Sequence, residues 1–201
     1  MRLVLARHGE SAGNVEQVFR GPVSQGDGLT ARGHAQARAL GQHLQTLGLE
    51  APRVYASTYR RAQETAQGIA AGLGGGVTVL DGLQEVDCGA WVGRAYRDLH
   101  EHWGEVLGED GQPAFAGGET AAQVAARVWA AVKPVLGERR TPVVVSHGFA
   151  LQAFMIAQAA GDPASAWQDE RYAHPNAAYT VLRRAGGGWE VEVLARRVPE
   201  L

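Results

Sequence analysis

The stretch that decides the fold is Leu3-Val4-Leu5-Ala6-Arg7-His8-Gly9-Glu10, in which an apolar run leads directly into chemically active side chains. The run predicts a first strand over residues 2–6. In an open α/β sheet the ligand crevice lies outside the carboxyl ends of the strands, so we expect Arg7 and His8 at a rigidly held ligand site. An arginine beside a histidine at this position suggests a phosphate site that carries its own nucleophile.

The order of strand, polar turn and helix returns along the rest of the chain. Further strands are predicted over 53–56, 77–80 and 142–145, with a hairpin of 179–183 and 190–194. Helices are predicted from an N-cap at Thr30 to Gly48, from a cap at Ser57-Thr58 to Leu73, from the capping box of Thr120 and Gln123 to Pro134, and after Ser146-His147-Gly148. This alternation predicts an α/β fold of three layers (αβα), with a mostly parallel central sheet and helices on both faces.

Length and composition limit the class of protein. A chain of 201 residues with 45% hydrophobic and 20% charged residues predicts one globular domain over 1–201, with a lid-like region at about 86–116. The net charge of -2 provides no field that would attract nucleic acid or an anionic membrane, so neither is expected as a partner. The sequence leaves open whether the protein is a monomer or a dimer.

Cysteine use and hydropathy indicate the compartment. Cys88 is the only cysteine, which excludes an intramolecular disulfide and fits a reducing environment. The apolar run at the start is too short for a secretory signal, and no stretch approaches the roughly 18 apolar residues of a membrane span. We therefore expect a cytoplasmic location.

Histidines and arginines at the strand exits match the needs of phosphoryl transfer. The transition state spreads charge over three oxygens, which cations such as Arg7 and Arg61 stabilise. Of the two histidines, His8 and His147, one neutral imidazole can attack phosphorus and the other, protonated, can bind the transferring group. Glu85 is placed to protonate the leaving oxygen, and partial burial would keep its carboxyl group protonated. Neither a metal nor a cofactor is required.

The chain resembles the histidine phosphatase superfamily, the phosphoglycerate mutase-like proteins, over nearly its whole length. Six segments carry the resemblance in order: Arg7 to Ser11 with Asn14; Leu29-Thr30 through Gly33 to Gln36-Ala37; Ser57 to Ala66; Leu83-Gln84-Glu85 with Gly89, Trp91 and Gly93; Gly117 to Thr120; and Ser146-His147-Gly148. Each segment alone is a weak signal, but the six in order are highly specific.

The resemblance implies a metal-independent phosphatase that hydrolyses small phosphate monoesters. It implies His8 as the nucleophile, Glu85 as proton donor and then as base for the hydrolytic water, and Arg7, Arg61 and His147 as a phosphate clamp. Asn14, the Gly148 amide, Gly21 and Ser57 complete the expected phosphate-binding set. The partner would be a small phosphorylated metabolite or inorganic phosphate. Gly28 stands where the family commonly has proline, which affects the entrance of the pocket and not its floor.

Two other activities remain open on the sequence. Mutases of the family carry a longer insertion after the acid, with extra basic residues that hold a carboxylated sugar phosphate. Only about thirty residues separate Glu85 from Gly118 here, and Arg94 and Arg97 are their only basic side chains apart from histidine. This favours a phosphatase over a mutase-type phosphotransferase. A non-catalytic phosphoester-binding protein is the less favoured third alternative, because no catalytic position is replaced.

The remaining reactive side chains have simpler explanations. Cys88 and Arg94 have the bare spacing of cysteine-dependent phosphatases, but Asp87 would raise the pKa of the thiol, so we interpret the match as accidental. A metal site is not expected, since His100 and His102 would point to different sides of a helix. Surface or packing roles are expected for the other histidines, and turn-stabilising roles for two acidic residues: His34, His43 and His174, and Glu10 and Glu119.

Overall fold

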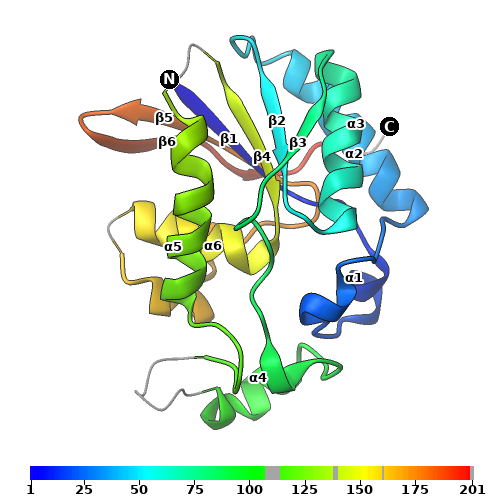
Figure 1. Ribbon diagram of the computed structural model, residues 1–201, viewed down its shortest axis with the longest axis vertical. Coiled ribbons are helices and arrows are strands. Elements are labelled where there is room, and N and C mark those ends of the chain that lie inside the picture. Colours follow the sequence, from blue (N-terminus) through cyan, green and yellow to red (C-terminus); the bar gives the residue numbers. More distant parts are fainter. Residues whose placement is uncertain (107–113, 138–139, 160, 200–201) are drawn as a thin grey trace.

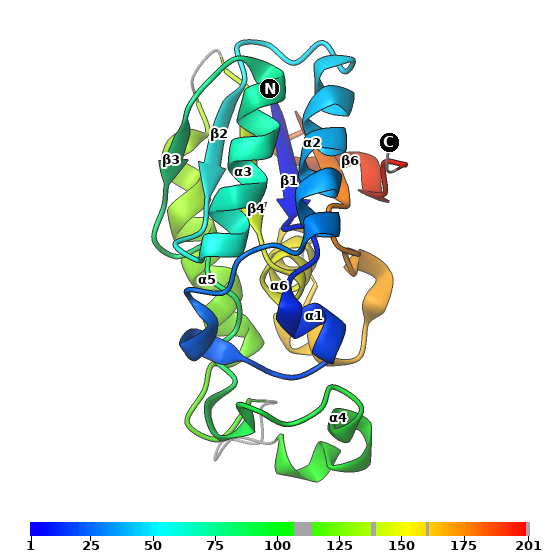
Figure 2. The ribbon, with the colours of Figure 1, turned by 90° about the vertical axis from the view of Figure 1, so that its right-hand side faces the viewer.

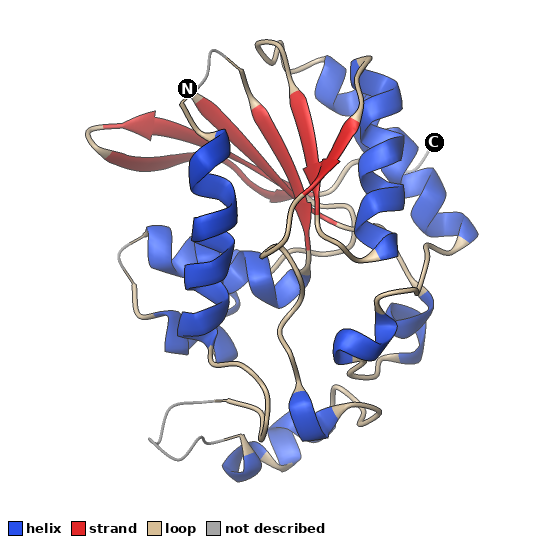
Figure 3. Ribbon diagram, viewed as in Figure 1, coloured by secondary structure: helices blue, strands red, loops and turns tan. Residues whose placement is uncertain are grey.

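A single mixed sheet forms the centre of the protein (Figure 1 and Figure 3). The structure, a computed structural model, describes residues 1–106, 114–137, 140–159 and 161–199. Within these residues the strand order is β3-β2-β4-β1-β5-β6, and the first four strands of this order are parallel while β5 and β6 are antiparallel. The strands are β1 (Arg2–Arg7), β2 (Arg53–Ala56), β3 (Val77–Val79), β4 (Pro142–Ser146), β5 (Tyr179–Ala185) and β6 (Gly188–Arg196).

Helices cover both faces of this sheet (Figure 2). The α-helices in the described residues are α1 (Ala12–Glu16), α2 (Ala31–Gln45), α3 (Arg60–Leu73), α4 (Asp98–Glu101), α5 (Ala121–Val132) and α6 (Gly148–Gln158), of which α1 and α4 lie beyond the carboxyl edge of the sheet. The pair α2 and α3 packs on one face and the pair α5 and α6 on the other. The predicted three-layer α/β fold is therefore confirmed. None of the helices in the described part of the chain is long and apolar enough to cross a membrane.

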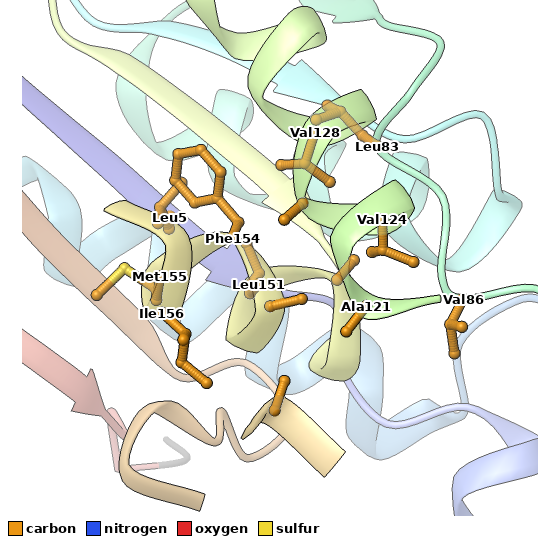
Figure 4. Packing of buried hydrophobic residues seen from close by; sticks show 14 of the residues in the cluster. Leu5, Leu83, Val86, Ala121, Val124, Val128, Leu151, Phe154, Met155 and Ile156 are labelled. Carbon is orange, nitrogen blue, oxygen red and sulfur yellow. The ribbon is translucent and has the colours of Figure 1, made fainter. Parts of the chain in front are cut away.

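Alternate residues of β1 supply the two hydrophobic cores. Leu3 and Leu5 face α5 and α6, and Figure 4 shows Leu5 among the side chains of these helices. Val4 and Ala6 face α2 and α3. Since all four side chains are fully buried, the carboxyl end of β1 is anchored from both sides. This anchoring fixes the position of the residues that follow the strand.

The ends of three parallel strands bring the expected site residues together. Arg7 of β1 lies beside Ser146 of β4, and the His8 amide donates to the Ser146 carbonyl over 3.0 Å. On the other side of β4, the Ser57 amide donates to the Val145 carbonyl over 3.0 Å. The segments that follow β1, β2 and β4 therefore meet at one edge of the sheet.

The local signals for helix ends are partly confirmed. Thr30 caps α2 by accepting from the Gly33 amide over 3.0 Å, and the capping box of Thr120 and Gln123 starts α5 as expected. Two boundaries differ from the prediction. Helix α2 ends at Gln45, before Gly48, and α3 is capped at Tyr59, not at Ser57-Thr58.

The lid-like region predicted at 86–116 lies beyond the carboxyl edge of the sheet (Figure 1 and Figure 2). Its residues 107–113 lie outside the described residues. The remainder contains α4 and two 3-10 turns, and it buries Trp91 and Phe115 in the same core as α5 and α6. It thereby supplies one wall of the cavity described below.

Candidate active site

His8 lies directly after β1, and its hydrogen bonds define its tautomer. Nδ1 is 2.7 Å from the Gly9 carbonyl oxygen, which can only accept, so Nδ1 carries the proton. Nε2 then accepts from Nε of Arg61 over 3.2 Å. The imidazole is only 3% exposed. The ring therefore presents a lone pair on Nε2 toward the Arg61 side of the site.

The surroundings of His8 favour its neutral form. Burial lowers the pKa of His8 well below 6.5, and the positive charges of Arg61 and Arg7 lower it further. The hydrogen bond to the Gly9 carbonyl acts in the opposite direction but is the smallest of these effects. His8 is accordingly an uncharged, nucleophilic imidazole at neutral pH.

Arg61 lies in the first turn of α3 and is held from two sides. Its Nη1 donates to the carbonyl and the hydroxyl oxygens of Ser24 over 3.0 and 3.1 Å. The guanidinium carbon lies 4.7 Å from the ring centroid of Tyr59. Ser24 ends the 3-10 turn Gly21–Ser24, of which the sequence analysis placed Gly21 at the site but assigned no role to Ser24. These contacts orient the guanidinium beside His8.

Arg7 is positioned by backbone groups from distant parts of the chain. Its Nη1 donates to the His174 carbonyl over 2.7 Å. Its Nε is buried and has no hydrogen-bond partner among the described residues. A Cβ at Gly148, the first residue of α6, would lie 3.3 to 3.5 Å from atoms of the guanidinium. The glycine therefore lets Arg7 lie against the start of α6.

His147 lies behind His8, and its ring centroid is 5.1 Å from that of His8. Its Nε2 is 2.9 Å from Oγ of Ser57, while its buried Nδ1 has no partner among the described residues. Oγ of Ser57 also accepts from the Tyr59 amide over 3.3 Å, so this hydroxyl connects His147 to the start of α3.

Without a bound phosphoryl group, the surroundings of His147 favour the neutral ring. The side chain is fully buried, and this burial lowers its pKa well below 6.5. The neighbouring Arg61 and His8 act in the same direction. The protonated form was expected for an imidazole that binds the transferring group, and it stays a prediction for that state.

Glu85 is clamped at the N-terminus of α6. Its Oε1 accepts from the amides of Val86 and Ala150 over 2.9 and 3.0 Å, and its Oε2 accepts from the Phe149 amide over 3.2 Å. Helix N-termini offer free amides and a positive dipole, which suit a carboxylate. The clamp fixes the carboxyl group at the wall of the cavity.

Arg127 of α5 holds the main chain around Glu85. Its guanidinium donates to the carbonyls of Gly82, Gln84 and Glu85 over 2.7 to 3.0 Å and forms an ion pair with Glu119 over 2.7 Å. No sequence signal marks this role, because the contact joins residues 43 positions apart in the chain. Arg127 is thus a structural support for the acid.

The remaining expected phosphate-binding residues divide into two groups. Asn14 and Gly21 line the cavity with Arg7, Arg61 and Gly148. Oδ1 of Asn14 accepts from Asn176 over 2.9 Å, and the Asn14 side chain also bonds to Tyr96. Gly21 has φ of 52°, a conformation that favours glycine.

Ser57 belongs to the second group, since it lies behind the cavity wall. It is fully buried, it is not among the lining residues, and its hydroxyl contacts His147. The structure thus places Ser57 against His147, which is likewise fully buried and not among the residues that line the cavity.

The cavity at this edge has a volume of about 300 Å³. The groups expected to bind phosphate or take part in catalysis form one end of it: Arg7, His8, Asn14, Arg61, Glu85 and Gly148. Apolar residues form much of the rest: Phe19, Val86, Leu99, Phe115, Phe149, Ala166, Trp167 and Ala173. This volume lies at the lower end of the range of small-molecule sites.

The non-catalytic roles expected for Cys88, Glu119 and His174 agree with the structure. Burial, followed by the charge of Asp87, raises the pKa of the Cys88 thiol to about 11, so a thiolate is disfavoured. Glu119 accepts from the Asp87 amide over 2.9 Å, as expected for a turn-stabilising residue. The ring of His174 bonds to Tyr172 and Thr180 in the interior.

No metal-binding cluster occurs in the described ranges, which contain no group of three or more His, Cys, Asp or Glu side chains placed for an ion. His102 forms an ion pair with Glu105 over 3.0 Å. The side chain of His100 lies outside the described residues.

The three-layer fold, with this edge of the sheet as its site, defines a phosphoglycerate mutase-like protein. The model of the histidine phosphatase superfamily (branch 1) matches residues 3–197, and the chain belongs to this family. The chain is similar to the 2,3-bisphosphoglycerate-dependent phosphoglycerate mutase of Brucella canis, with 36% identity over 77% of this chain and 80% of the relative.

Solved structures of phosphatases are also similar. A mycobacterial glucosyl-3-phosphoglycerate phosphatase has 26% identity and a TM-score of 0.79, with 96% of this chain and 97% of that chain covered. The phosphoserine phosphatase of Entamoeba histolytica, in complex with 3-phosphoglyceric acid, has 25% identity and a TM-score of 0.81, covering 96% and 95%. The activities of these similar proteins include both mutase and phosphatase.

Proposed function

We propose that the protein is a metal-independent phosphatase that hydrolyses small phosphate monoesters through a phosphohistidine on His8. One observation carries the proposal: the neutral imidazole of His8 lies at one end of the cavity with Arg7, whose buried Nε has no partner among the described residues. A buried polar group without a partner is costly, and a phosphate oxygen would satisfy it. The partner is accordingly a small phosphorylated metabolite.

In the first step, Nε2 of His8 attacks phosphorus and the ester P–O bond breaks. A protonated Glu85 gives its proton to the leaving oxygen, which departs as the alcohol. Nδ1 of His8 keeps its proton, and the hydrogen bond from Nδ1 to the Gly9 carbonyl stabilises the positive charge that the ring acquires. Arg7 and Arg61, which line the cavity, donate to the equatorial oxygens of the transferring group.

In the second step, Glu85, now a carboxylate, takes a proton from a water molecule that attacks phosphorus. The P–N bond breaks, its electron pair returns to Nε2 of His8, and inorganic phosphate leaves. Glu85 ends the cycle protonated, as it began. The N-terminus of α6 supports the carboxylate in the intermediate, through the amides of Phe149 and Ala150.

A mutase-type phosphotransferase is the second candidate, favoured by the 36% identity to the Brucella canis enzyme. The charge of the cavity argues against it. Apart from Arg7 and Arg61, Arg20 is the one Arg or Lys among the described lining residues, and it pairs with Glu16 and Asp27. A carboxylated sugar phosphate would find no unpaired cation there.

The two candidates, and a protein that only binds phosphoesters, differ in their products. With phenyl phosphate we expect equal amounts of phenol and inorganic phosphate, without added metal and unaffected by EDTA. With 3-phosphoglycerate we expect slow release of phosphate and no 2-phosphoglycerate. Isomerisation without phosphate release would establish the mutase instead, and saturable binding without turnover would establish a binding protein.

The protonation of His8 gives a test that does not depend on turnover. Because burial and two arginines lower its pKa, we expect ¹⁵N NMR of the free protein to show a neutral ring, protonated at Nδ1, at pH 6.5 and somewhat below. Protonation on further acidification would remove the nucleophile. Arg61→Gln removes one cause of the shift, so it should raise the midpoint toward 6.5. A midpoint at or above 6.5 in the unmodified protein would contradict this account.

A further inference from the structure

We infer that the leaving group of the substrate is apolar and carries no second anion. This inference rests on the proposed phosphatase function and concerns the half of the cavity that lies away from His8. It is based on the lining of that half, on its charge and on an adjoining hollow.

The outer half of the cavity is built from packed aromatic rings. The ring centroid of Trp167 lies 4.5 Å from that of Phe149 and 4.9 Å from that of Phe115. Phe19 packs edge to face against Phe115, with centroids 5.2 Å apart. Rings held in this way form a rigid apolar wall. Covering an apolar group with this wall is favourable, whereas desolvating a charge against it is unfavourable.

Apart from Arg7 and Arg61, the charged side chains that line the cavity are predominantly negative. The guanidinium of Arg20 pairs with Glu16 and lies 3.7 Å from Asp27, while its buried Nε has no hydrogen-bond partner among the described residues. Glu170 also lines the cavity and forms no ion pair with the described residues. A carboxylate or second phosphate on the leaving group would therefore meet like charge without a free counter-charge.

A second hollow extends the apolar half. It has a volume of about 260 Å³ and shares Leu99, Trp167 and Glu170 with the first cavity, while Trp103 and Gln168 complete its lining. The indole N–H of Trp167 is buried without a partner among the described residues, so the wall offers one neutral donor. Together the two hollows suit a leaving group of at least one ring, with a neutral hydrogen-bond acceptor.

Matched aryl esters test the inference. 4-Carbamoylphenyl phosphate and 4-carboxyphenyl phosphate have nearly the same shape and differ by one negative charge. We expect kcat/KM at pH 7.5 to be at least about tenfold higher for the carbamoyl ester, because its KM is lower. Glu170→Gln should shrink this ratio several-fold, whereas Glu50→Gln, an exposed charge at the opposite end of β2, should leave the ratio unchanged.

A second pair of variants tests the apolar wall. Trp167→Ala and Leu99→Ala should each lower kcat/KM for 1-naphthyl phosphate about tenfold or more and have little effect on methyl phosphate, which does not reach the wall. Comparing the two esters on the same preparation separates loss of the wall from loss of folding.

The outcomes separate the inference from the proposed function. Equal or higher kcat/KM for the carboxyl ester would overturn the inference without contradicting the proposed phosphatase function. The inference would also be overturned if Trp167→Ala and Leu99→Ala lowered kcat/KM equally for the naphthyl and methyl esters while the thermal unfolding of both variants was unchanged. Failure to release phosphate from every ester would overturn the proposed function, and the inference with it.

Discussion

His8→Ala is expected to lower kcat/KM for phenyl phosphate by about 10⁴-fold or more, since it removes the atom that forms the covalent intermediate. The neighbouring donors remain, so phosphate binding should persist, weakened only by the lost packing. Binding of inorganic phosphate, measured by calorimetry, then serves as the check that the site is still folded. Initial rates of phenol release measure the effect.

His34→Ala provides the matched control. This histidine is 46% exposed at the side chain and pairs with Glu64, away from the cavity lining. It should keep the activity of the unmodified protein. Cys88→Ser should also be nearly silent, because the thiol is buried with a raised pKa. An active His8→Ala protein, together with an inactive Cys88→Ser protein, would replace the proposed mechanism with a cysteine-dependent one.

Glu85→Gln is expected to lower kcat for phenyl phosphate by about 10² to 10⁴-fold, the usual contribution of a general acid. With 2,4-dinitrophenyl phosphate, the rate of the step that releases dinitrophenol should fall by less than about tenfold, because this leaving group departs without a proton. A burst of dinitrophenol followed by slow turnover is expected, since the same variant lacks the base for the hydrolytic water.

The dependence on leaving group distinguishes acid catalysis from support of α6. Glu85 accepts three backbone hydrogen bonds, and glutamine retains one carbonyl oxygen for them, so some loss of stability is expected as well. Thermal unfolding of the variant measures that loss. An equal reduction in the release of phenol and dinitrophenol would show that Glu85 only positions the start of α6.

Much of the fold followed from local signals. The fully buried strand β4 was visible as an apolar run, and the polar residues after β1, β2 and β4 meet because parallel strands align their carboxyl ends. Helix α1 was missed because its five residues are too few to show an apolar period. Tyr59 replaced Ser57 as the cap of α3 because the Ser57 hydroxyl contacts His147, 90 residues away.

The supports of the site were less accessible to sequence reasoning. Ser24 holds Arg61, Arg127 holds the chain at Glu85, and the His174 carbonyl holds Arg7. Each of these is a contact between a side chain and a distant backbone carbonyl. Such contacts depend on how loops and helices pack together, and neither residue spacing nor composition predicts them. Family motifs indicated the groups that we propose to react, while packing determined what orients them.

The most direct test of the central claim is to locate the phosphoryl group after a rapid alkaline quench of the first turnover. Cleavage at arginine releases peptide 8–20, in which His8 is the only histidine, and a separate peptide that contains His147. The account predicts an alkali-stable, acid-labile phosphoryl group on peptide 8–20, attached to Nε2 of His8, and none in the His8→Ala protein. A phosphoryl group on His147 or Cys88, or turnover that proceeds with no phosphoenzyme, would contradict it.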